Sequence, residues 1–287
     1  MRKASEKLFV APSAVNRQIL LLEEELGVEL FERLPKGLQL NTAGERLLRH
    51  VQSTLLDFEM VRTDIDALKG DKTGHVRVAS MDSLLVELLP SAVEEFSRNF
   101  PAVTYTILAA PPVDIVSMLL SAQVDIGCTF VDRIPPSLKV AASASMPLGI
   151  VMPPGHPLAD RSAVTLEECS RYPYMRSSTN PAVSNAMSPE FARFWEETIP
   201  VATCSSTTLI KRLILAGKGI SCFSKIAFVD ELNRGELVWR PFAFPSMNQI
   251  RVGIFVPAQR SLTDVAQHFL GRMVKKLHEL EIGSAHL

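Results

Sequence analysis

The feature that most constrains the fold is an alternation of strand-like and helix-like segments that begins at His75. The segments HVRVAS, VTYTILA and VDIGCTF are typical of strands, and amphipathic patterns at about 84–99 and 113–122 separate them. Strands joined by single helices in this way imply a parallel sheet with helices on its faces. The sequence therefore predicts an α/β domain after residue 74.

A second series of the same kind starts near Pro147. It contains the strand-like segments GIVMPP, PVATC and GISCFS, helix patterns at about 188–197 and 207–216, and a late strand, IRVGIFV. A final amphipathic helix follows at about 262–280. We predict two lobes with a cleft between them, because ligands of such sheets bind at the carboxyl ends of strands and at helix N-termini. The predicted lobes are 75–148 with 247–287, and 149–246.

Residues 1–46 have a different pattern, that of a winged helix-turn-helix with a small β wing. A short helix, RKASEKL, precedes a tight turn and a second helix, which starts at Pro12 and ends at a glycine C-cap, Gly27. Two short apolar runs then flank Pro35-Lys36-Gly37, which is typical of a hairpin turn. The second helix carries an apolar stripe at helical spacing, which predicts that one face is buried. The stripe consists of Ala14, Val15, Ile19, Leu22 and Leu26.

Residues 47–74 are predicted to form a dimerisation helix followed by a hinge. Thr42 stands three residues before Glu45, which is the spacing of a capping box, and a long helical pattern follows to about Lys69. Apolar residues recur along it with heptad spacing, which favours a partner helix over packing on the helix's own domain. The predicted seam consists of Leu47, Val51, Phe58, Val61, Ile65 and Leu68.

Composition excludes several classes of protein. The net charge is −1, so DNA affinity would depend on how charge is placed rather than on its sum. No apolar run reaches the ~20 residues of a membrane span, and the N-terminus lacks the apolar core of a signal peptide. The four cysteines are scattered, without zinc spacing or a C-x-x-C pair. We expect a cytoplasmic protein that has reduced thiols, no metal, no cofactor and no membrane contact.

Several motifs, in order, resemble those of the LysR-type transcriptional regulators. They are ASEKL (4–8), VAPSAVNRQI (10–19), LEEELGVELFER (22–33), LNTAGERLL (40–48), LLP (88–90), F-x-x-x-F-P (96–101), VDIG (124–127), GHPLA (155–159) and AGKGIS (216–221). The resemblance spans almost the whole chain. It implies a winged helix-turn-helix followed by a two-lobed effector domain, built like a periplasmic solute-binding protein.

The N-terminal end of the second helix is the segment that would enter the major groove of DNA. Arg17 is suited to a guanine and Gln18 to an adenine, and either could instead hold a phosphate. Each side chain alone could equally be a solvated surface group. The predicted DNA-binding residues are Ser13, Ala14, Asn16, Arg17, Gln18, Arg33 and Lys36.

Two departures from the family pattern affect this prediction. Asn16 stands where serine is usual, which would change the base preference. Family members also carry another helix before the segment that starts at Arg2. We therefore expect this chain to be truncated relative to the pattern, to leave Leu8, Val15, Ile19 and Leu22 without part of their cover, and to bind DNA weakly or not at all.

The resemblance implies a small organic effector, often an anion, between the two lobes. Ser83 is the preferred contact, because it would lie at a helix N-terminus, although it and Ser206 could be N-caps only. Arg176 could neutralise a carboxylate. Pro111, Pro112 and neighbouring apolar residues instead favour an apolar pocket and a hydrophobic ligand. The predicted effector-binding residues are Ser80, Met81, Asp82, Ser83, Ala110, Pro111, Cys128, Thr129, Phe130, Arg176, Cys204, Ser205, Ser206 and Thr207.

The predicted function is ligand-responsive transcription regulation by a homodimer or homotetramer on an interrupted palindromic operator in double-stranded DNA. An enzyme is disfavoured, because the sequence has no nucleophile elbow, zinc-protease, P-loop or dinucleotide motif, and we predict no catalytic residue. A secreted solute-binding protein would not need the helix-turn-helix. The remaining alternative is a truncated ligand-binding or thiol-redox-sensing regulator with impaired DNA binding, which would use Cys128 and Cys204.

Overall fold

The computed structural model describes residues 2–34, 37–48, 50–51, 54–55, 58, 61, 73–131, 134–178, 189–244, 247 and 249–285. The chain divides into two compact units, Met1–Glu59 and Met60–Leu287. Within the described residues, no helix is long and apolar enough to cross a membrane.

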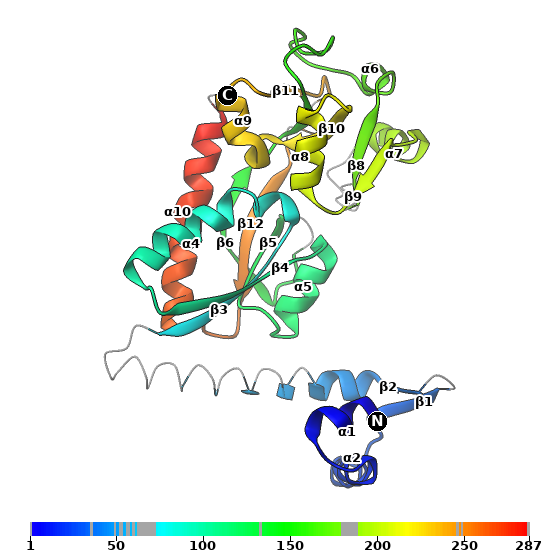
Figure 1. The fold of residues 1–287 in the computed structure, drawn as a ribbon. Helices are drawn as coiled ribbons and strands as arrows, with labels where there is room; N and C mark the ends of the chain where they lie inside the picture. Colours follow the sequence, from blue (N-terminus) through cyan, green and yellow to red (C-terminus); the bar gives the residue numbers. More distant parts are fainter. Residues whose placement is uncertain are drawn as a thin grey trace. The chain divides into compact units, whose positions relative to one another are not determined.

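The first unit contains the expected two helices and hairpin (Figure 1). Helix α1 spans Arg2–Leu8 and helix α2 spans Pro12–Leu26. Gly27 ends α2 in the left-handed conformation, with φ 66°, as the sequence predicted. Strands β1 (Phe31–Leu34) and β2 (Gly37–Leu40) pair antiparallel and form the wing.

The predicted buried stripe of α2 is not buried in this unit. Helix α2 contains no buried residue, and Leu22 and Leu26 on the stripe are exposed, while Ile19 is half-buried. Leu8 on α1 is also exposed. These exposures leave the described part of the unit with a small core, and weakened DNA binding stays a prediction.

A further helix begins after the wing, and its N-cap differs from the expected one. Residues 42–48 are helical, and the side chain of Asn41, rather than Thr42, accepts the backbone N–H of Gly44 at 2.9 Å. Asparagine at this position supplies the acceptor one residue earlier than the capping-box pattern indicated. Apolar side chains at Val51, Phe58 and Val61 are exposed, whereas Leu47 is half-buried. The predicted seam residues Ile65 and Leu68 lie outside the described residues.

The second unit has two five-stranded sheets, which confirms the two-lobed fold. The first sheet has the order β4-β3-β5-β12-β6. Its strands are β3 (Gly74–Ser80), β4 (Val103–Ala109), β5 (Ile126–Phe130), β6 (Leu138–Ser145) and β12 (Arg251–Pro257). Strand β3 runs parallel to β4 and β5, whereas β12 runs antiparallel to β5 and β6. The sheet is therefore mixed rather than parallel throughout, because β12 returns to it from the other lobe.

The second sheet has the order β11-β7-β10-β8-β9. Its strands are β7 (Leu148–Met152), β8 (Tyr174–Ser177), β9 (Ala202–Cys204), β10 (Ile220–Ser224) and β11 (Val238–Pro241). Strand β8 is parallel to β9 and β10, and β7 is antiparallel to β10 and β11. The chain crosses between the sheets after β6 and again before β12 (Figure 1).

Helices cover both sheets and bury their apolar faces. The first sheet is flanked by α4 (Leu88–Asn99), α5 (Pro112–Leu120) and α10 (Asp264–Ala285), with α4 and α10 side by side (Figure 1). The other helices are α6 (Leu166–Cys169), α7 (Pro189–Glu197), α8 (Thr207–Leu215), α9 (Val229–Asn233) and the 3-10 turns η1 (Asp82–Leu84) and η3 (Lys225–Phe228). The lobes have separate apolar cores, and Phe130 packs against both.

Candidate functional site

The N-terminal end of α2 presents the polar side chains that the sequence assigned to DNA. Ser13, Ala14, Arg17 and Gln18 are exposed, and Arg17 stands one helical turn after Ser13. Asn16 is half-buried and lines a groove between α2 and the wing, so it is less accessible than its neighbours.

The structure describes one of the two residues that the sequence assigned to DNA contact from the wing. Arg33 lies on β1, opposite Leu38 of β2, and Lys36 lies outside the described residues.

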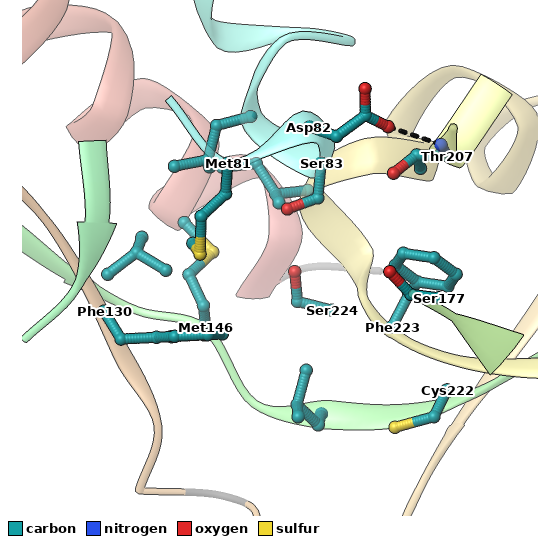
Figure 2. A pocket seen from close by; sticks show the side chains of 14 residues that line it. Met81, Asp82, Ser83, Phe130, Met146, Ser177, Thr207, Cys222, Phe223 and Ser224 are labelled. Atoms are coloured by element: carbon teal, nitrogen blue, oxygen red, sulfur yellow. Dashed lines mark hydrogen bonds between the residues drawn. The ribbon is translucent and has the colours of Figure 1, made fainter. Parts of the chain in front are cut away.

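The second unit contains a cavity between its two sheets. Figure 2 shows 14 residues around it, and the empty space measures about 640 Å³ with its opening to solvent included. Its walls come from η1, the end of β5, the crossing between β6 and β7, the end of β8, the start of α8, the end of β10 and β12. This position at strand ends and lobe crossings is where ligands of α/β sheets bind.

The cavity has an apolar part and a hydroxyl-bearing part. Met81, Met146 and Phe130 lie together on one side, while the hydroxyls of Ser83 and Ser224 face the middle (Figure 2). The remaining lining residues are Asp82, Leu84, Leu148, Ser177, Thr207, Cys222, Phe223, Ile226 and Val252. Such a wall suits a small organic molecule with few polar groups.

The sequence predicted part of this lining. Of the expected effector contacts, those that line the cavity are Met81, Asp82, Ser83, Phe130 and Thr207. Those that do not are Ser80, Ala110, Pro111, Cys128, Thr129, Arg176, Cys204, Ser205 and Ser206. Ser177 and Ser224 were missed, although the carboxyl-end rule applied to β8 and β10 would have found both. No local sequence pattern indicated that Met146, Ile226 or Val252 would line the cavity.

Ser83 reaches the cavity for a reason other than the one predicted. Helix α4 begins at Leu88, so Ser83 lies within the 3-10 turn η1 and not at the N-terminus of a long helix. The premise of an anion site at that helix start was therefore wrong. Ser206 is the N-cap of α8, and its hydroxyl accepts the N–H of Leu209 at 3.3 Å.

The side chain of Arg176 does not line the cavity and makes its contacts near the end of α7. Its Nη2 donates to the main-chain carbonyl oxygens of Trp195 and Thr198, and its guanidinium lies 4.8 Å from the centroid of the Trp195 ring. These contacts hold it at the end of α7 rather than in the cavity lining.

The carboxylate of Asp82 joins the two lobes. Its Oδ2 accepts the backbone N–H of Thr207, the first residue of α8 (Figure 2). Asp82 belongs to η1 of the first lobe, and α8 belongs to the second. The first N–H groups of a helix lack intrahelical partners, so a carboxylate at this position is stabilised by both the hydrogen bond and the helix dipole.

The buried thiols are poor candidates for redox sensing. Burial raises the pKa of the Cys128 thiol to about 12, although a hydrogen bond with Ser80 lowers it in part. Burial and the nearby Glu168 raise the pKa of Cys169 to about 12 as well. Burial and Cys169 also raise the pKa of Cys222. Reactive cysteines need a lowered pKa and some exposure, because the thiolate is the nucleophile.

Cys128 and Cys169 are therefore expected to resist iodoacetamide at pH 7.5 in the folded protein. A thiol with a pKa near 12 carries a far smaller thiolate fraction than a free cysteine, whose pKa is about 8.5. Peptide mass spectrometry would follow each cysteine, with the same reaction in guanidinium as the control. Rapid alkylation of Cys128 in native protein would contradict this expectation and restore the thiol-sensing alternative.

Comparison with known proteins identifies the family. The sequence model of the bacterial regulatory helix-turn-helix protein, LysR family, matches residues 1–45, and that of the LysR substrate binding domain matches residues 69–277. The chain belongs to the LysR family of DNA-binding transcriptional regulators, with a helix-turn-helix and an effector-binding domain. Members of this family bind DNA and small-molecule effectors and typically form oligomers.

Individual relatives agree with this assignment. The chain is 27% identical to the transcriptional regulator SsuR of Burkholderia cenocepacia over 238 residues, which cover 82% of this chain and 77% of that protein. It is 22% identical to the transcriptional activator LysR of Escherichia coli over 280 residues, which cover 98% and 89%. These relatives are transcriptional regulators and not enzymes.

Solved structures show the same fold. Full-length OxyR from Pseudomonas aeruginosa superposes with a TM-score of 0.65 at 19% identity, over 96% of this chain and 88% of that one. The LysR family regulator CbnR superposes with a TM-score of 0.58 at 17% identity, over 98% and 93%.

Proposed function

We propose that this regulator binds an interrupted palindromic operator as a homodimer or homotetramer in the cytoplasm, and that a small organic effector in the interlobe cavity controls it. The observation that carries the proposal is the cavity itself, which is formed by strand ends and crossings of both lobes. A ligand there contacts both lobes at once, so it favours one lobe arrangement over others and shifts the population of the assembly.

The DNA contact is proposed for the exposed N-terminal face of α2. Arg17 and Gln18 are exposed, adjacent and at the end of the helix that would enter the major groove. The acidic residues Glu24 and Glu25 lie two turns further along and are also exposed. This placement keeps negative charge away from the phosphates while presenting donors to base edges.

The operator dimer is proposed to form through the helix that follows the wing. Its exposed apolar residues recur at heptad spacing, which is the pattern of a helix-helix seam. A two-fold pair of recognition helices then reads two half-sites, which explains why the expected operator is palindromic.

Arg17→Ala is expected to weaken operator binding by about 1–3 kcal/mol for each half-site, because a bidentate base or phosphate contact is lost. Fluorescence anisotropy on the intergenic DNA beside the gene, at fixed salt, would measure this loss. Glu25→Ala on the same helix is the control and should bind at least as well as wild type. The proposed DNA contact is wrong if both variants bind alike. If the wild-type chain shows no preference for this DNA over an unrelated duplex, the alternative of a regulator with impaired DNA binding replaces the proposed function.

A further inference from the structure

We propose that Asp82 is a specificity-determining residue: its carboxylate fills the anion position at the N-terminus of α8 and selects an uncharged effector over a carboxylate. This inference rests on the proposed function, since it concerns the ligand of the same cavity. It departs from the anionic effector that the family resemblance favoured.

The first step is that protein side chains already accept from two of the N-terminal donors of α8. The helix spans nine residues, Thr207–Leu215, and its first N–H groups have no partner within the helix. Asp82 Oδ2 accepts the N–H of Thr207, and the Ser206 hydroxyl accepts the N–H of Leu209. A carboxylate ligand would have to displace Asp82 to obtain the stabilisation that this helix end gives an anion.

The second step concerns the charge of the wall. Among the described residues that line the cavity, Asp82 is charged and none is Lys, Arg or His. The cation expected from sequence, Arg176, is held by the carbonyls of Trp195 and Thr198. A second carboxylate in this space would face Asp82 without a compensating cation, and like charges repel most strongly where water is excluded.

The third step is that Asp82 is held in place by the packing of its own segment. Val86, four residues further along the first lobe, packs against an apolar cluster of the second lobe that contains Ile210, Phe223 and Phe228. The turn η1 also contacts η3 at the end of β10. These contacts position the segment of Asp82 against the second lobe, within reach of the Thr207 N–H.

The lining residues other than Asp82 indicate which kind of ligand fits the cavity. Met81, Met146 and Phe130 suit an aromatic or aliphatic body, and the hydroxyls of Ser83 and Ser224 can bond a hydroxyl, carbonyl or amide group (Figure 2). The Ser224 hydroxyl makes no capping bond to the turn η3 that follows it. The predicted effector is thus a small neutral molecule with an apolar body and one polar end.

Acetate provides a test that does not depend on knowing the effector. Asp82→Ala leaves the Thr207 N–H open, so acetate should raise the melting temperature of the full-length variant by more than that of wild type. Asp114→Ala, which removes an exposed carboxylate from the first turn of α5, is the matched control and should respond as wild type does. If acetate stabilises the three proteins equally, or stabilises none, Asp82 does not occupy an anion position and the proposal falls.

A second variant covers the case in which Asp82→Ala fails to fold. Asp82→Asn keeps the shape and an acceptor for Thr207 but removes the charge, so calorimetry should show benzoate binding at least about tenfold tighter than to wild type. Benzamide, which has the same ring and no charge, should bind both proteins alike. Benzoate binding that does not increase in Asp82→Asn, whether weak or strong, overturns the proposal.

The same preparations separate this inference from the proposed function. Operator binding by wild type tests the regulator, whereas the acetate and benzoate responses test Asp82 alone. If wild type binds its operator but the Asp82 variants respond to acetate and benzoate as wild type does, only the inference about Asp82 is wrong. If the Asp82 variants respond more strongly to acetate and benzoate but wild type binds no operator, only the proposed function is wrong.

Discussion

Asp125→Ala is expected to lower the free energy of unfolding of the second unit by about 3–5 kcal/mol, the cost of removing one partner from a buried ion pair. Asp125 is 8% exposed and accepts Arg77 Nη2 at 2.8 Å, Arg77 Nε at 3.1 Å and Arg260 Nη2 at 3.3 Å. It also accepts the backbone N–H of Arg77 at 3.1 Å. Its loss would leave two guanidinium groups at the start of β5, in the middle of the first sheet, without their shared carboxylate.

Urea unfolding would measure this loss through tryptophan fluorescence, because Trp195 and Trp239, the two tryptophans of the chain, both lie in the second unit. Asp160→Ala removes an exposed aspartate and should change the free energy by no more than about 0.5 kcal/mol. Asp125→Asn, which keeps an acceptor but no charge, should fall between the two. Equal midpoints for Asp125→Ala and Asp160→Ala would show that the network contributes nothing net.

Phe58→Asp is expected to weaken dimerisation by about 3–6 kcal/mol, or at least a hundredfold in the dissociation constant. Phe58 is 65% exposed in the single chain and lies on the predicted heptad seam. Burying one phenylalanine side chain stabilises an interface by about 1.5–3 kcal/mol, and a two-fold interface contains two copies. The aspartate would also place like charges opposite one another.

Sedimentation equilibrium would give the dissociation constant, and anisotropy on the full operator would give the consequence for DNA. Ser53→Asp introduces the same charge at a position that the heptad pattern places off the seam, so it should leave both quantities close to wild type. If Phe58→Asp keeps the wild-type dimer constant and operator affinity, the dimer does not form through this helix. The seam prediction would then be abandoned.

Local patterns determined much of this protein. The turn residues Pro12 and Gly27 set the bounds of α2, and the alternation after His75 indicated two α/β lobes. These features are predictable because helix caps and burial periods depend on neighbouring residues. Strand β6 was missed, because its alternating segment LKVAASAS is only partly buried and resembles a loop in composition.

The cavity contains contacts that local sequence patterns do not predict. Sequence reasoning found Met81, Asp82 and Thr207 by their positions at strand and helix ends, but not that Asp82 bonds Thr207 across 125 residues of chain. It also assigned Arg176 to a ligand, whereas in the folded chain that guanidinium donates to the carbonyls of Trp195, in α7, and Thr198, just after α7. The sequence by itself determined the family and most of the elements. Only the tertiary structure decided which charges meet, because those contacts join segments that are brought together by packing and not by any local preference.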